Sequence, residues 1–318
     1  MEYVVGFDTS NYTTSVAVCT LDGKIVANIK RPLPVGEGAC GLRQSDAVFA
    51  HVKNLPSACE ELRDVVRGAR IVGVGVSRSP RQAEGSYMPC FLTGVAAAKS
   101  FAAAADAPIS FFSHQDGHIR AAVYSCGAEE MLLKSDSFAA FHVSGGTTEI
   151  LHVVPSSDGF AVTLVGETAD LNMGQLIDRT GVMMGLSFPC GRELEQLAAQ
   201  YEGEIPQIKT CVRDCRCNLS GLQNLAEKLW KESGDAKLVS AYVLRSAAKT
   251  LEKMTAQLDA KHGRLPIVYA GGVMSNRYLQ SVLSKRKDTY FAEPAFSADN
   301  AAGIALLCAD QIRRANQN

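Results

Sequence analysis

The chain has 318 residues, of which 47% are hydrophobic and 20% charged, and its 32 basic and 33 acidic residues give a net charge of −1. This composition excludes a disordered chain, and the charge balance argues against a protein that mainly coats nucleic acid or an anionic membrane. The length favours two domains or two lobes that share a cleft.

The first third of the chain predicts a sheet with flanking helices. Strands are expected at 3–7, 15–21 and 25–29, with an Asp22-Gly23 hairpin turn between the last two. A helix at 45–67, interrupted near Pro56, precedes a buried strand at 71–76, a polar loop at 77–85, a helix at 91–105 and a strand at 108–112. The start of the chain resembles a strand more than a signal peptide, and no apolar run is long enough to span a membrane. We therefore expect a cytoplasmic protein whose cysteines are reduced.

The rest of the chain continues the alternation of strands and helices. Strands are expected at 138–143, 149–154 and 160–165, with a turn at Asp158-Gly159 before the third. Helices follow at 172–185, 191–201, 219–232 and 237–261, then a strand at 267–270, a helix from Ser275, a short strand near Tyr290 and a last helix from Asp299. This order predicts an α/β protein. The expected lobes are 1–121 with 295–318, and 122–294.

Residues 7–16 can be laid over residues 141–150. In each segment a strand enters a turn of small residues that ends in Thr-Thr, a second strand leaves the turn, and an Asp-Gly turn leads to a third. This likeness indicates duplicated βββαβα modules and predicts the two-lobed actin-like (ASKHA) fold, with a ligand cleft between the lobes. Small residues allow backbone N–H groups to approach a phosphate, so the first turn, with Asp8, Ser10 and Thr13, is expected on the phosphate side.

A metal site is predicted from two histidines and a distant acid. His114 and His118 are four residues apart, which places them on one face if a helix begins there. In the actin-like fold the last helix returns to the first lobe, so Asp299 can join them. Two imidazoles and one carboxylate suit iron, zinc or manganese and leave positions for a ligand's oxygens. The glutamate that a zinc protease carries between its histidines is absent, which argues against a protease.

These motifs, in this order, resemble the TsaD family, once labelled glycoprotease or peptidase M22. The most specific are four: His114-Gln115-Asp116-Gly117-His118, Val143-Ser144-Gly145-Gly146, Ala270-Gly271-Gly272-Val273 and Asp299-Asn300-Ala301-Ala302. The resemblance covers nearly the whole chain. It implies a metal-dependent enzyme that transfers a threonylcarbamoyl group from threonylcarbamoyl-adenylate to the exocyclic amine of the tRNA adenosine beside the anticodon. It also implies tRNA and companion subunits as partners, the latter being a second actin-like subunit and an ATPase. A homodimer is a further expectation.

The resemblance assigns roles to individual residues. His114, His118 and Asp299 would hold the metal, which is iron by resemblance. Asp178 would bind the ribose hydroxyls. The other residues expected to bind the adenylate are His142, Val143, Ser144, Gly145, Gly146, Gly191, Glu195 and Asn276.

Several positions depart from the family pattern. Asn11-Tyr12-Thr13 stands where Cys-Asp-Glu is usual, and Thr147 stands where a histidine is usual. The segment 78–85 replaces a glycine-rich loop, Gln175 replaces a glutamate and Cys190 a glycine. A divergent paralogue that binds a nucleotide and a metal but catalyses other chemistry, or acts as a scaffold, therefore remains an alternative. A phosphotransferase or ATPase is another, since Asp8 is retained in the first turn.

Two further features stand apart from this pattern. Cys211, Cys215 and Cys217 could hold zinc or an iron–sulfur cluster, although a fourth ligand is not evident, and a reduced surface loop is the alternative. Lys209, Arg213 and Arg216 could instead contact RNA phosphates.

Overall fold

The computed structural model describes residues 1–10, 12–34, 42–157 and 159–317. The helices in these ranges are each too short or too polar to cross a membrane. The chain divides into two compact units: unit 1 comprises Met1–Ser125, Pro155–Ala161 and Ala295–Asn318, and unit 2 comprises Cys126–Val154 and Val162–Pro294. The lobes expected from the sequence differ in two places. They end the first segment at 121, inside a helix that continues to Ser125, and they leave 155–161 in the second lobe.

Unit 1 is built on a five-stranded sheet with the order β3-β2-β1-β4-β5. The first three strands are antiparallel neighbours, and β4 and β5 run parallel to β1. Their bounds are β1 Glu2–Thr9, β2 Thr13–Thr20, β3 Ile25–Pro32, β4 Arg70–Ser79 and β5 Ile109–Ser113. The strands therefore occur where the sequence predicts them, with β4 extending into the expected loop.

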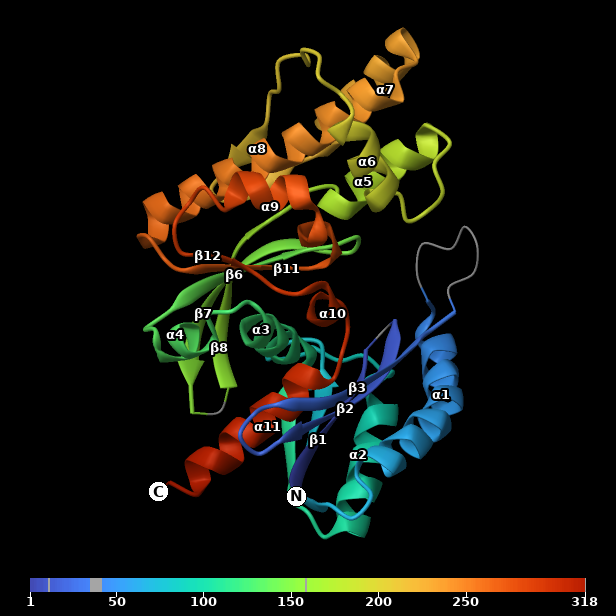
Figure 1. The fold of residues 1–318 in the computed structure, drawn as a ribbon, viewed down its shortest axis with the longest axis vertical. Coiled ribbons are helices and arrows are strands. Elements are labelled where there is room, and N and C mark those ends of the chain that lie inside the picture. The colour runs from blue at the N-terminus through green and yellow to red at the C-terminus, as the bar shows by residue number, and fades with distance from the viewer. Residues whose placement is uncertain (11, 35–41, 158, 318) are drawn as a thin grey trace. The chain divides into compact units, whose positions relative to one another are not determined.

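Helices cover both faces of this sheet (Figure 1). The helices α1 (Gln44–Val65) and α2 (Phe91–Ala105) pack on one face, where Val5 and Phe7 join Leu62 and Ala98 in a buried core. Because alternate residues of a strand face opposite sides, Gly6 faces α11 (Ala302–Ala315), and a Cβ there would lie 2.6 Å from the Ala301 oxygen. The expected interruption at Pro56 is wrong. The helix continues through the proline, since Leu62 beyond it is buried against the sheet.

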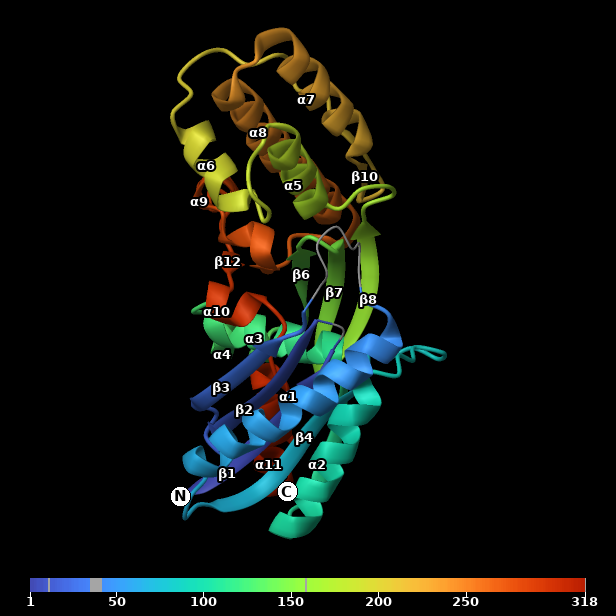
Figure 2. The same cartoon turned by 90° about the vertical axis from the view of Figure 1, so that its right-hand side faces the viewer.

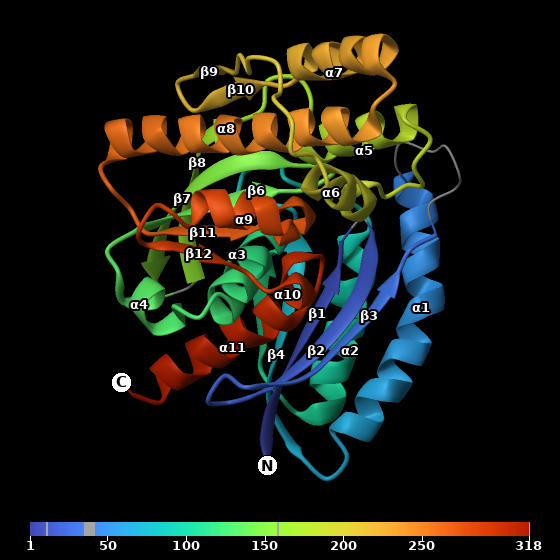
Figure 3. The same cartoon turned by 45° about the horizontal axis from the view of Figure 1, so that its top comes forward.

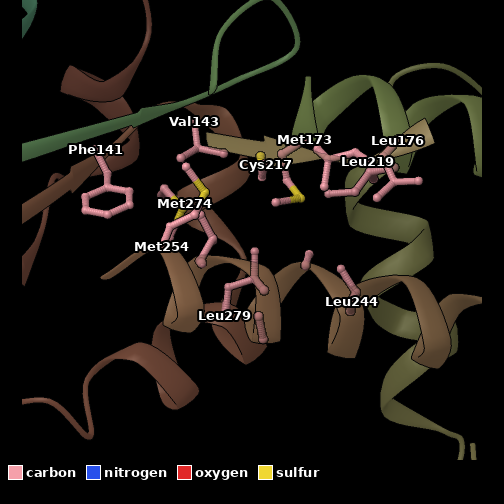
Figure 4. Close-up of a cluster of buried hydrophobic side chains, with 14 of the residues drawn as sticks. Phe141, Val143, Met173, Leu176, Cys217, Leu219, Leu244, Met254, Met274 and Leu279 are labelled. Carbon is pink, nitrogen blue, oxygen red and sulfur yellow. The ribbon is translucent and has the colours of Figure 1, made fainter. Parts of the chain in front are cut away.

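Unit 2 repeats the design with a sheet of order β12-β11-β6-β7-β8. Its strands are β6 Phe138–Val143, β7 Thr148–Ser156, β8 Gly159–Glu167, β11 Ile267–Ala270 and β12 Thr289–Phe291. The main helices are α5 Met173–Met183, α6 Gly191–Ala199, α7 Ser220–Ser233, α8 Ala236–His262 and α9 Arg277–Leu283. Figure 4 shows how Phe141 and Val143 of the sheet pack with helix residues such as Leu244 and Leu279 in one buried core.

Smaller elements were not anticipated from the sequence. They are α4 (Glu129–Lys134), a 3-10 turn (Gly272–Ser275), α10 (Pro294–Ser297) and a hairpin of β9 (Cys211–Arg213) and β10 (Arg216–Asn218). The hairpin lies beside α8 in Figure 3. The predicted helix at 237–261 is confirmed as α8, whereas the helix predicted from Ser275 begins at Arg277, because the preceding residues form the 3-10 turn.

The internal duplication is confirmed residue by residue. The two sheet orders correspond strand for strand, with β1-β2-β3-β4-β5 matched by β6-β7-β8-β11-β12. In the first module Phe7 pairs with Val16, and in the second Phe141 pairs with Ile150, which are the positions that the overlay of the sequences brings together. Of the two Asp-Gly turns, the second includes Asp158, which lies outside the described residues, as does Asn11 of the first small-residue turn.

Candidate functional site

Three potential metal ligands converge in unit 1. His114 is the first residue of α3 (His114–Ser125) and follows β5 directly, so His118 lies one turn further on the same face. The Nε2 atoms of the two histidines are 2.9 Å apart. Oδ1 of Asp299 lies 3.1 Å from Nε2 of His118 and 3.6 Å from Nε2 of His114. The predicted juxtaposition of these three side chains is therefore present in the structure.

Close packing of α11 on α3 brings Asp299 to the histidines. A Cβ on Gly303 would lie 1.8 Å from the backbone oxygen of Gly117, so the two helices meet without side chains between them. Further along, Nε of the buried Arg120 donates to Oδ2 of Asp310 at 2.7 Å. Asp299 does not start the last helix as expected. It precedes α11, because the Asn300 side chain accepts from the N–H of Ala302.

The buried Asp8 orients the first histidine. Its Oδ2 lies 2.6 Å from Nδ1 of His114. An ionised carboxylate only accepts hydrogen bonds, so Nδ1 carries a proton and Nε2 faces His118 and Asp299. A metal-binding histidine usually has such a second partner. Nothing in the sequence pattern identified this role for Asp8, which was expected near a phosphate.

The electrostatics of this cluster favour a cation. Burial acts most strongly on His114 and lowers its pKa, but the charges of Asp8 and Asp299 and their hydrogen bonds raise it to about 10. Burial likewise raises the pKa of Asp299, yet hydrogen bonds from both histidines hold it well below its usual range. The proton that His114 gains can be replaced by a divalent ion on Nε2. Two nitrogens and a carboxylate oxygen at these separations match metal–ligand distances of about 2.1 Å, so the residues fit a metal.

The first small-residue turn is less accessible than expected. Ser10 is buried at the end of β1, and its backbone oxygen lies 2.8 Å from Nε2 of His51. The hydroxyl of Thr14 is also buried and lies 2.8 Å from Nδ1 of the same histidine. Asp8 is 1% exposed and bound to His114. Of the three residues assigned to the phosphate side, only Thr13 is partly exposed.

A pocket in unit 2 collects several of the predicted nucleoside-binding residues. It has a volume of about 600 Å³ and lies where the N-terminus of α6 meets the second small-residue turn and the loop after β11. Predicted residues in its lining are Gly145, Asp178, Gly191, Glu195 and Asn276. Burial raises the pKa of Asp178, while the N–H of Cys190, donating to Oδ1 at 2.9 Å, opposes this.

Two of these lining residues have structural duties that the sequence did not reveal. The Asn276 side-chain oxygen accepts from the N–H of Leu279 and caps α9, so its amide nitrogen is the part that could serve a ligand. Oε1 of Glu195 accepts from the N–H of Arg277 at 2.7 Å. The pocket also contains Phe188 and Arg192, which the sequence analysis did not select. The only signal in the sequence was the position of Phe188, three residues before the predicted Gly191; its exposure is seen only in the structure.

The remaining predicted residues of the second turn do not line this pocket. Val143 is fully buried in the core, and His142 pairs with Glu149, its Nδ1 lying 3.9 Å from Oε1. The Ser144 hydroxyl accepts from the N–H groups of Gly146 and Thr147. These two N–H donors are therefore engaged within the turn.

Three of the departures from the family pattern have local structural roles. Gln175 forms a capping box with Asn172 at the start of α5. Cys190 is buried against Gly181. A Cβ added to Gly181 would lie 2.2 Å from the Cβ of Cys190. In the segment 78–85, Nε2 of Gln82 donates to the buried Asp116 of α3 at 2.6 Å.

The cysteine cluster does not form a metal site in the described residues. His114, His118 and Asp299 are the one group there whose ligand atoms lie within 4.8 Å of one another. Cys215 and Cys217 are buried in the unit 2 core, and Cys211 is exposed. The expected surface loop is a hairpin.

The sequence is similar to one family of known proteins over most of its length. The profile of the TsaD family, described as tRNA N6-adenosine threonylcarbamoyltransferase, matches residues 43–306. A protein of that name from Methanopyrus kandleri is 28% identical over 95% of this chain and 85% of its own length. One from Streptococcus gordonii is 30% identical over 99% of this chain and 94% of its own length.

Solved structures share the fold. Full-length HypF, in a phosphate- and nucleotide-bound form, superposes with a TM-score of 0.60 over 100% of this chain and 56% of that one, at 14% identity. A ROK hexokinase from Thermus thermophilus superposes with a TM-score of 0.52 over 99% of this chain and 100% of that one, also at 14% identity. These likenesses confirm the predicted actin-like fold.

Proposed function

The chain belongs to the TsaD family, and from this premise we propose that it transfers a threonylcarbamoyl group from threonylcarbamoyl-adenylate to N6 of the tRNA adenosine beside the anticodon. In this reaction N6 forms a bond to the carbamoyl carbon, the bond from that carbon to the phosphate oxygen breaks, and AMP and a proton leave. The observation that carries the proposal is the convergence of His114, His118 and Asp299 in a chain of this family.

The metal-binding part of the proposal rests on unit 1. His114, His118 and Asp299 would hold one divalent ion, iron by family resemblance, which when bound supplies a Lewis acid for the oxygens of the donor group. Asp8 keeps the proton of His114 on Nδ1, so that Nε2 remains directed at the ion. Asp8 is thereby a positioning residue and not a phosphate ligand.

The nucleoside part of the proposal rests on unit 2. Asp178 uses one carboxylate oxygen for Cys190, which leaves the other for ribose hydroxyls. Phe188 offers an aromatic face for the adenine, since its side chain is exposed at the pocket. Gly145 and Gly191 allow the nucleotide to approach the backbone closely, because neither carries a side chain.

The alternatives find different support. The absence of the usual acids at 11–13 supports a paralogue that binds the same ligands without transfer. Asp8 does not support the phosphotransferase alternative, because its carboxylate is buried against His114. The equivalent position in unit 2 is His142, which carries no carboxylate for magnesium.

A transfer assay tests the proposal. The protein, threonylcarbamoyl-adenylate and unmodified tRNA are combined with iron, with and without the companion subunits, which are a second actin-like subunit and an ATPase. Modified adenosine, read by mass spectrometry of nucleosides, is the expected product. Asp299→Ala should abolish both product and metal binding, whereas Asp136→Ala, an exposed acid of unit 2, should change neither. No product from the wild type, beside an active family member, would leave the paralogue as the better description.

A further inference from the structure

A band of positive charge follows one surface of unit 2, where residues 208–216 lie along α8. Nζ of Lys249 donates to the backbone oxygen of Ile208 at 3.2 Å. Nζ of Lys253 donates to the backbone oxygen of Thr210 at 3.5 Å. These contacts place both ammonium groups beside the neighbouring Lys209. We name as the basic strip the six cations Lys209, Arg213, Arg216, Lys249, Lys253 and Lys261, each of which is exposed.

The strip is held rigidly at its far end. Nε2 of Gln257 donates to the Val212 oxygen at 3.0 Å, and its Oε1 accepts from the N–H of Cys215 at 2.9 Å. Lys261 lies one helical turn beyond Gln257 on the same face of α8, so it belongs to the same end. From Lys249 to Lys261 the helix rises roughly 18 Å at about 1.5 Å per residue. The segment 208–215 is therefore bonded to α8 at Lys249, Lys253 and Gln257, and the hairpin lies beside this helix (Figure 3).

The hairpin itself has an arrangement that stability does not explain. Arg213 and Arg216 are direct cross-strand partners, and like charges at such positions repel. The two residues between them, Asp214 and Cys215, have φ values of 50° and 61°, a left-handed conformation that aspartate adopts readily and that at Cys215 is held by its buried side chain and by its N–H bond to Gln257. The like-charged arginine pair is therefore the feature that stability does not explain, and such conflicts are expected at functional sites.

The acids on this surface offset only part of its positive charge. Glu167 pairs with Arg216 at 3.1 Å, and Asp214 lies at the hairpin tip. Within the described part of the chain, Arg213 has no carboxylate at ion-pair distance. The whole chain has a net charge of −1, so this concentration of cations is local. Each lysine ammonium that contacts a carbonyl retains donors for another group.

We infer that the basic strip binds the phosphate backbone of the RNA substrate, and that the guanidinium groups of Arg213 and Arg216 contact phosphates at the hairpin tip. The inference rests on the proposed function for the identity of the RNA. Exposed guanidinium and ammonium groups on a rigid support are the usual phosphate contacts of RNA-binding proteins, and they bind without reading sequence. The partner chemistry is a structured polyanion, which a row of this length suits better than a single small anion.

Binding of unmodified tRNA at a series of salt concentrations tests this. The variant Arg213→Gln/Arg216→Gln should reduce the slope of log affinity against log salt by about 2, because each lost phosphate contact removes about one unit. Arg213→Lys/Arg216→Lys should restore the slope. The control Arg63→Gln/Arg67→Gln removes two exposed arginines near the end of α1 and should leave it unchanged. Thermal unfolding of all variants checks that the fold is kept.

The outcomes separate the strip from the transfer reaction. If the wild type transfers the group but the glutamine variant binds tRNA with an unchanged slope, the inference is overturned and the function stands. If there is no transfer but the variant lowers the slope, the strip is an RNA surface of a protein with another activity. A wild type that does not bind tRNA overturns the inference, as does a variant that loses only its companion subunits, since an acidic protein would then be the partner.

Discussion

Replacing Gly303 with alanine should separate α11 from α3 and so move Asp299, which precedes α11, away from the two histidines. The new methyl group would lie 1.8 Å from the Gly117 oxygen, 2.7 Å from its carbonyl carbon and 2.9 Å from the nitrogen of Ala121. All three are backbone atoms, which cannot rotate away as a side chain can. The helices must therefore move apart, and Asp299 with them.

The size of the effect follows from two opposing contributions. Alanine is better than glycine in a helix by about 1 kcal/mol, which on its own would stabilise the variant. Overpacking a close contact costs about 1–3 kcal/mol, and a backbone-to-backbone clash belongs at the upper end. We expect a net loss of about 2 kcal/mol in the free energy of unfolding of unit 1, and metal affinity lowered about 100-fold by a shift near 1 Å.

Urea unfolding of the metal-free protein and metal titration measure the two effects. Gly221→Ala is the matched control, because this glycine also lies in a helix, α7, and has no heavy atom within 4 Å of its Cβ position. It should be neutral or stabilising by up to about 1 kcal/mol. Equal stability and metal affinity of Gly303→Ala and wild type would refute the idea that this contact sets the site.

Three further changes test single contacts. Asp8→Ala removes the partner of His114 and should lower metal affinity about 10- to 100-fold, as isothermal titration can measure. Asp178→Ala should weaken binding of AMP or the adenylate about 10-fold or more by removing a charged acceptor, and unchanged affinity would place the nucleoside elsewhere. Asp170 is exposed, and although burial raises its pKa, hydrogen bonds from residues such as Leu219 and Ser220 lower it to about 2. Because that pKa is depressed by folding, its contribution is present above about pH 4 and is lost as pH falls through 2. Asp170→Ala should therefore cost about 1 kcal/mol at neutral pH and distinctly less near pH 2, which unfolding at both values checks.

The sequence anticipated the elements because their signals are local. Short continuous runs of apolar residues mark β1 and β6, and the repeated Thr-Thr and Asp-Gly turns revealed the duplication down to the pairing of Phe7 with Val16. The hairpin at 211–218 was missed because its turn has Cys215 after Asp214, where a glycine would signal it.

The residues of the candidate site also fall into those that local spacing predicts and those that tertiary packing decides. A spacing of four residues is enough to place His114 and His118 on one face of a helix, because helical geometry is local. Asp8, 106 residues from His114, and the duties of Asn276 and Glu195 as acceptors for backbone N–H groups depend on which elements pack together. The composition set the charge of the chain near zero, but only the packing of residues 208–216 on α8 gathers its cations into one strip. Charge is a property of composition, whereas its concentration on a surface is decided by tertiary contacts between residues far apart in the chain.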